Sequence, residues 1–75
     1  MKFKEGDRVI CVKVILNEEE HLLDKEGTIS SIVHPENDYD YWVKFDGGLE
    51  GSEITTDGAT RMSEYELAKA GVRFV

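Results

Sequence analysis

Residues 39–46 read Tyr-Asp-Tyr-Trp-Val-Lys-Phe-Asp, and this stretch indicates the fold most clearly. Its core-type side chains occur at every second position, with polar residues and Trp42 between them. A period of two is typical of a β-strand with one face in the core and the other toward solvent. We therefore predict a strand here, with Val43 and Phe45 as core neighbours. Trp42 and Lys44 then share the opposite, partly exposed face.

Further strand-sized apolar segments lie on both sides of this stretch. They are rich in β-branched residues or bounded by glycine and turn residues, and they cover 8–15, 28–33, 59–62 and 72–75. Neighbouring apolar residues in 8–15 compete for the inner face, so we expect a bulge or burial on both faces there. Ser63 and Glu66 have capping-box spacing, which predicts one turn of helix with Leu67 directed inward.

A chain of 75 residues has room for one domain, which we place at 1–75. Its hydrophobic fraction of 40% is enough for a single core. Short strands separated by turns predict an all-β fold: a small antiparallel barrel of four to five strands, with one short helical turn near the C-terminus. The alternative is an open meander with a terminal helix over residues 63–70.

Four segments together resemble SH3-like small β-barrels. They are Gly6-Asp7-Arg8-Val9, Glu26-Gly27-Thr28-Ile29, Tyr41-Trp42-Val43-Lys44-Phe45-Asp46 and Glu64-Tyr65-Glu66-Leu67. Their order is similar to that in a family of small stromal photosystem I proteins and in barrels with a KOW-type turn around Gly27. The resemblance implies the SH3-like barrel and a role in binding other proteins, and it implies no site residue. Those families use basic surfaces, whereas this chain is acidic.

The net charge of −7 is unevenly distributed. Residues 1–15 carry four basic and two acidic side chains, and residues 16–75 carry five basic and fourteen acidic ones. Such a surface repels phosphates and anionic lipid, so we expect neither direct nucleic-acid binding nor membrane binding. It attracts a protein partner with a basic or mixed surface. The single cysteine, Cys11, excludes an internal disulfide and favours a cytoplasmic location.

Trp42 is the first candidate for partner binding, because exposed aromatic residues concentrate interface energy. Lys44 shares its face and Tyr39 lies close in sequence, so both join the candidate set. In the alternative interpretation the loop over residues 47–60 folds across Trp42, since tryptophan is usually well buried.

The acidic segment from Glu18 to Glu26 is the second candidate. We interpret it as a solvated loop, held down by Leu22 and Leu23, in which Glu18, Glu19 and Glu20 attract a basic partner. Carboxylates suit calcium or magnesium, but this spacing matches no EF-hand loop. We therefore predict no metal site.

No group of residues points to catalysis or to a cofactor. Cys11 with His21 and His34 supplies the residue types of a thiol catalyst, yet Cys11 lies within an apolar strand. The glycines of residues 47–58 lack the lysine and the helix that phosphate binding requires. The sequence thus favours a non-enzymatic protein-interaction module. The alternative is a nucleic-acid-related protein, either a DNA mimic or an accessory of RNA or DNA machinery.

Overall fold

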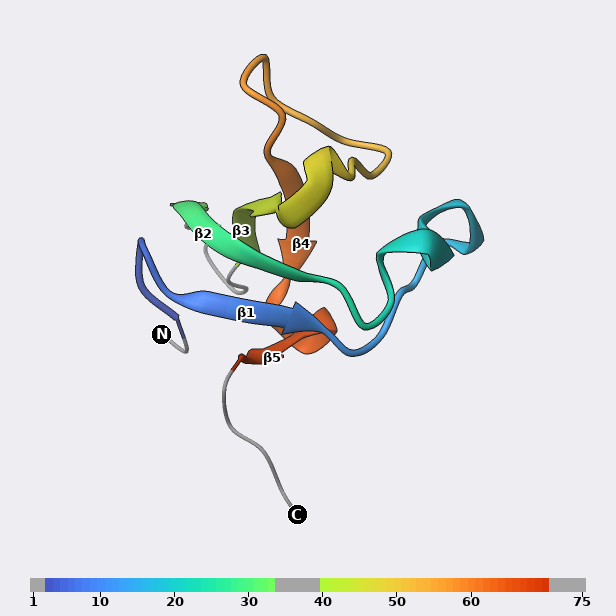
Figure 1. Ribbon diagram of the computed structural model, residues 1–75, viewed down its shortest axis with the longest axis horizontal. Coiled ribbons are helices and arrows are strands. Elements are labelled where there is room, and N and C mark those ends of the chain that lie inside the picture. The colour runs from blue at the N-terminus through green and yellow to red at the C-terminus, as the bar shows by residue number, and fades with distance from the viewer. Residues whose placement is uncertain (1–2, 34–39, 71–75) are drawn as a thin grey trace.

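The computed structural model describes residues 3–33 and 40–70 of the chain. They form one antiparallel sheet of five strands: β1 (Arg8–Cys11), β2 (Glu26–Val33), β3 (Asp40–Phe45), β4 (Thr60–Ser63) and β5 (Leu67–Lys69). Three short 3-10 helices join them: η1 (Asn17–Leu22), η2 (Asp46–Gly48) and η3 (Glu64–Glu66). Figure 1 shows η1, in cyan, and the orange loop before β4 projecting away from the sheet.

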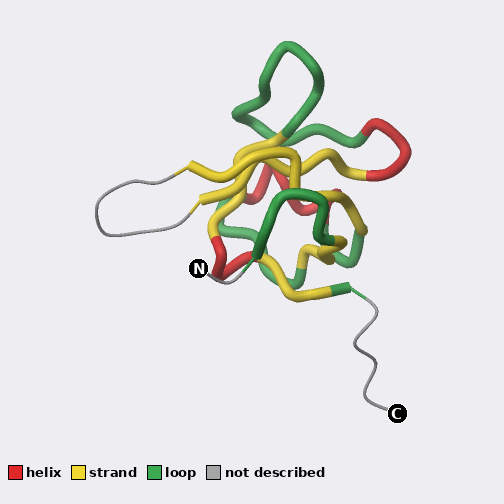
Figure 2. The backbone as a smooth tube through the Cα atoms, turned by 90° about the vertical axis from the view of Figure 1, so that its left-hand side faces the viewer, coloured by secondary structure: helices red, strands yellow, loops and turns green. Residues whose placement is uncertain are grey.

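The strand order is β4-β3-β2-β1-β5, so the first four strands form a meander and β5 returns beside β1. Figure 2 shows the strands curved around the domain rather than lying in one flat layer. Within the described residues, β4 and β5 are the two edges of the hydrogen-bonded ladder. The predicted all-β fold with a short helical turn is confirmed. The alternative helix over 63–70 is wrong, because β5 occupies part of that range.

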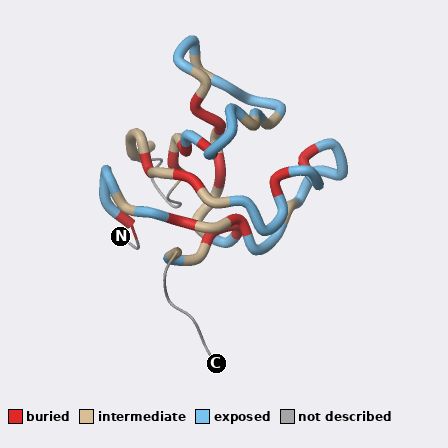
Figure 3. Tube along the Cα trace, viewed as in Figure 1, coloured by how far each residue is buried: buried red, intermediate tan, exposed pale blue. Residues whose placement is uncertain are grey.

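The core follows the alternation that the sequence predicts for β3. Tyr41 and Val43 are fully buried and Phe45 is 5% exposed. Between them, Trp42 is half-buried and Lys44 is exposed. Figure 3 shows buried segments running through the centre of the sheet. Further buried apolar residues complete this core: Phe3, Val9, Cys11, Leu22, Ile29, Met62 and Leu67.

A bulge in β2 was not predicted. The register of β2 against β3 shifts between Ile29 and Ser31, which leaves one extra residue on β2. Ile29 is buried and Ile32 packs against the core, although three positions separate them. The bulge is the reason both can face inward, because an uninterrupted strand would turn them to opposite faces.

Gly27 lies where β2 passes close to β3. A Cβ atom there would stand 2.7 Å from the carbonyl oxygen of Lys44 and 2.8 Å from Cγ1 of Val43. Both distances are far inside van der Waals contact. The predicted close approach at Gly27 is therefore confirmed.

The first strand is shorter than predicted. β1 ends at Cys11, and the next amide, that of Val12, donates a hydrogen bond of 2.8 Å to the carbonyl of Glu66. The competition within 8–15 is resolved because the chain leaves the sheet, without the expected bulge or two-sided burial. Val12 and Ile15 are consequently 48% and 68% exposed.

The end of the described chain differs in detail from the prediction. The helical turn is confirmed as η3, and Ser63 N–H donates a hydrogen bond of 2.9 Å to Glu66 Oε1, as a capping box requires. Leu67 points inward and is 2% exposed. The strand predicted over 72–75 lies outside the described residues, and β5 at Leu67–Lys69 is the strand that pairs with β1.

Candidate functional site

Trp42 lies on the outer face of the sheet, between the neighbouring strands. Its partners in register are Ser31 on β2 and Arg61 on β4. Side chains directly opposite each other in an antiparallel pair share one face. Trp42 is half-buried among these neighbours, as the alternation predicts. The other aromatic candidate, Tyr39, lies outside the described residues.

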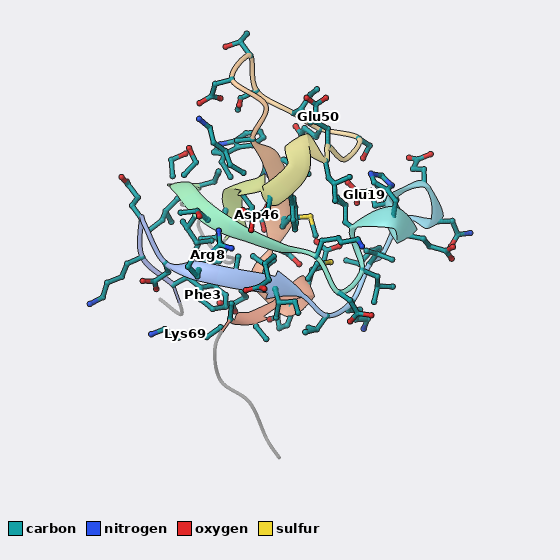
Figure 4. The ribbon with its side chains drawn as sticks, in the orientation of Figure 1. Phe3, Arg8, Glu19, Asp46, Glu50 and Lys69 are labelled. Atoms are coloured by element: carbon teal, nitrogen blue, oxygen red, sulfur yellow. The ribbon has the colours of Figure 1, made fainter. Side chains whose placement is uncertain are left out.

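The cations on this outer face are already paired. Lys44 is exposed, and its Nζ lies 3.3 Å from Oδ2 of Asp57. Arg8 Nη1 donates a hydrogen bond of 3.0 Å to Oδ1 of Asp46, and Figure 4 labels both residues near the centre of the view. This guanidinium lowers the pKa of Asp46 below its ordinary value, chiefly through the hydrogen bond. Arg61 on the same face pairs with Asp40, so each of these three cations is matched by a carboxylate.

Glu19 contradicts the interpretation of residues 18–26 as a fully solvated loop. Its side chain is only 4% exposed, and its Oε2 accepts hydrogen bonds from the Ser52 amide at 3.0 Å and the Ser52 hydroxyl at 3.3 Å. Glu18 and Glu20, on either side, are exposed. The segment is the 3-10 helix η1, which turns every third side chain to the same side and so directs Glu19 and Leu22 inward.

A second contact joins η1 to the loop before β4. His21 Nε2 lies 2.7 Å from the carbonyl oxygen of Glu50, so this ring nitrogen donates its proton. A Cβ atom on Gly51 would collide with the Glu19 carboxylate and lie 2.5 Å from Cγ2 of Thr60. We call the contacts of Glu19 and His21 with residues 50–52 the η1 clamp. Figure 4 places Glu19 on η1, facing this loop.

Glu66 is a second buried carboxylate close to the clamp. It is 6% exposed, and its Oε2 accepts a hydrogen bond of 3.3 Å from the Ile15 amide. Its Oε1 holds the Ser63 amide. Glu66 thereby fixes the chain after β1 against η3. Both buried carboxylates are held by uncharged donors, so their negative charge is stabilised but not neutralised.

An open cleft of about 300 Å³ lies between these elements. Ile15 and Leu16 provide its apolar part and are 68% and 45% exposed. Its polar lining comes from η1, the loop before β4, the outer face of the sheet and η3: Glu19, Asp40, Ser52, Glu53, Arg61, Ser63 and Glu66.

Asp40 and Arg61 connect the cleft to Trp42. Oδ2 of Asp40 accepts hydrogen bonds from Arg61 Nε at 2.9 Å and pairs with Arg61 Nη2 at 2.8 Å. Arg61 is the register partner of Trp42, and Asp40 precedes Trp42 by two positions on the same strand. Asp40 and Arg61 thus belong both to the face of Trp42 and to the cleft that the buried candidate Glu19 lines. Lys44 points to Asp57, and Glu18 and Glu20 do not line the cleft.

Sequence reasoning missed Arg61, Glu53, Ile15 and Leu16 as members of this surface. Asp40 carried a signal, since alternation places it on the face of Trp42. Arg61 carried none, because its position depends on the pairing of β4 with β3. Ile15 was assigned to a strand that ends earlier.

The structure also bears on the thiol of Cys11 and on possible metal ligands. Cys11 is fully buried, as predicted, and burial raises the pKa of its thiol. No three His, Cys, Asp or Glu side chains of the described residues are grouped to hold a metal ion. None of the helices formed by 3–33 and 40–70 is long and apolar enough to cross a membrane.

No family model, curated protein or solved structure matches the chain.

Proposed function

We propose that this protein is a non-enzymatic interaction module that docks a protein partner with a basic or mixed surface. The observation that carries the proposal is that the Asp40–Arg61 pair, which neighbours the half-buried Trp42 on the sheet, also lines the acidic cleft. An aromatic residue with charged and polar groups around it is a typical composition for an interface centre with a polar rim. The resemblance to SH3-like barrels, which bind other proteins, supports the same conclusion.

The charge of the molecule supports a basic or mixed partner. The net charge is −7, and the carboxylates of Glu18, Glu20 and Glu53 have no hydrogen bond or ion pair within the described residues. Exposed carboxylates accelerate association with a cationic surface, and salt screens this effect. Mimicry of a DNA duplex, the alternative, needs outward rows of carboxylates. Glu19 and Glu66 are buried, so they add nothing to such rows.

A site-resolved capture tests the proposal. A photo-crosslinking amino acid replaces Leu16, which lines the cleft, or Leu23, which is 37% exposed and does not line it. We expect a discrete protein adduct in the native cell from position 16 only, and its loss when Trp42→Ala is added. Identical adducts from both positions, or none from position 16, would contradict a docking role for this surface.

A further inference from the structure

We infer that the cleft binds one cationic side chain, that of an arginine or lysine flanked by aliphatic residues in a linear segment of the partner. This inference rests on the proposed docking function and specifies the chemistry of the same site. It commits to a peptide segment rather than a metal ion, a small molecule or a nucleic acid.

The charge of the cleft lining favours a cation. The cleft is lined by four carboxylates and one guanidinium, which gives a formal charge of −3. Arg61 is engaged by Asp40 at 2.8 Å, so it neutralises no other carboxylate. Glu53 has no partner for its carboxylate among the described residues and is exposed beside the cleft. A cation entering here gains attraction from several carboxylates and meets one already compensated positive charge.

The cleft also has an aliphatic part. Ile15 and Leu16 are exposed by 68% and 45% and stand at the same cleft as the carboxylates. Arginine and lysine combine an apolar stem with a charged end, so they can cover aliphatic surface while the charge meets a carboxylate. A metal ion or a free ammonium ion has no apolar surface that could cover this aliphatic part of the cleft. A neighbouring aliphatic residue of the segment would cover the rest of it.

The size of the cleft fits a single side chain. The cleft measures about 300 Å³, which stands at the lower limit of pockets for small organic ligands. It is open, so it admits a side chain that remains attached to a passing chain. The carboxylates of Glu19 and Glu66 are held by the amides of Ser52, Ser63 and Ile15. They therefore add negative electrostatic potential to the cleft, but they cannot rearrange to coordinate a metal ion.

The test uses two blocked pentapeptides and the full chain. One peptide is Gly-Leu-Arg-Leu-Gly, and the other carries citrulline, a neutral isostere, in place of arginine. Amide shifts of the isotope-labelled protein are followed in a titration to millimolar peptide. We expect saturable shifts at Ile15, Ser52 and Glu53 with the arginine peptide, several times weaker binding with citrulline, and weaker binding at higher salt. A lysine peptide is expected to bind at the same residues.

Matched variants sharpen the test. Glu53→Gln should weaken binding roughly three- to fivefold, whereas Glu5→Gln removes the same charge away from the cleft and should leave binding unchanged. Leu16→Ala should weaken it, and Leu23→Ala should not. Absence of shifts, equal binding of the citrulline peptide, or shifts outside the cleft would overturn the inference, as would an unaffected Glu53→Gln variant.

The outcomes separate this inference from the proposed function. A Trp42-dependent adduct at position 16 without arginine-peptide binding would leave the docking function standing and remove the cationic specificity. Peptide binding with no adduct would keep the chemistry of the cleft and remove the docking function. If a DNA-binding protein forms the adduct but the peptides do not bind, mimicry becomes the better account.

Discussion

The core of the sheet and the η1 clamp stabilise the same small domain with contacts of opposite kinds. In the core, Tyr41 and Val43 from β3 lose all contact with solvent among other apolar side chains. In the clamp, the buried Glu19 carboxylate is held by the amide and hydroxyl of a single residue, Ser52. Apolar burial gains from any well-fitting neighbour, whereas a buried carboxylate depends on specific donors. The stability of the core should therefore depend on the side-chain volume that a substitution removes. The stability of the clamp should depend on whether the hydrogen-bonding atoms are kept.

The largest expected effect lies in the core. Phe45→Ala should lower the free energy of unfolding by about 3–5 kcal/mol, because it removes a buried ring and leaves a cavity. A domain of this size has a margin of similar magnitude, so the variant should be largely unfolded. Chemical denaturation monitored by circular dichroism measures this. Tyr65→Ala, an aromatic residue that is 69% exposed, is the control and should change stability little. A cooperative transition for Phe45→Ala near that of wild type would disprove the register of β3.

The second effect compares two glycines, one in each region. Gly27→Val should cost about 1–3 kcal/mol, because its Cβ meets the backbone oxygen of Lys44, which cannot move without disturbing the sheet. In Gly51→Ala the nearest atoms to the added Cβ all belong to side chains, those of Glu19 and Thr60, and none belongs to the backbone. Gly51→Ala should cost less than Gly27→Ala in the same denaturation experiment. Equal costs would show that the clamp is as rigid as the sheet.

The third effect isolates the clamp. Glu19→Ala should destabilise the protein by about 1–2 kcal/mol, because the Ser52 amide loses a charged acceptor. The neighbours provide matched controls, since Glu18→Ala and Glu20→Ala remove the same charge from exposed positions. Both should stay within about 0.5 kcal/mol of wild type. Equal changes in the free energy of unfolding for the three variants would show that the segment is the solvated loop that the sequence indicates.

The smallest effect concerns the ion pairs on the outer face. The hydrogen bond from Arg8 lowers the pKa of Asp46 in the folded state, below the ordinary value of 3.8. A depressed carboxyl pKa adds stability at pH values above 3.8, and this contribution is lost as the pH falls through the folded-state value. We expect Asp46→Asn to flatten the decline in stability below about pH 4. An NMR titration of the Asp46 carboxyl group checks the direction directly, and a midpoint above 3.8 would contradict it.

These two regions also differ in how far the sequence predicts them. The alternation around Val43 and Phe45 is local, so the strand, its core face and the position of Trp42 follow from neighbouring residues. The contact between Glu19 and Ser52 joins residues 33 positions apart, and no local pattern distinguishes Glu19 from Glu18 or Glu20. The clamp and the cleft depend on how distant segments pack together, so local sequence does not predict them.

The premature end of β1 has a similar origin. Residues 12–15 have strong strand propensity, but tertiary contacts override it. The amides of Val12 and Ile15 are bound by the carbonyl and the carboxylate of Glu66. This diversion exposes Ile15 at the cleft. The departure from the local pattern thus lies at the surface to which we assign function, as is common in natural proteins.

The most direct test of the account is the hydrogen exchange rate of the Ser52 amide. The central claim is that the buried Glu19 carboxylate holds the η1 clamp together at the acidic cleft, and Ser52 N–H donates to that carboxylate at 3.0 Å. The account predicts an amide that exchanges far more slowly than in an unstructured chain, and that loses this protection in Glu19→Ala while amides of β2 and β3 keep theirs. Exchange of Ser52 in the wild type at the unstructured rate would contradict it.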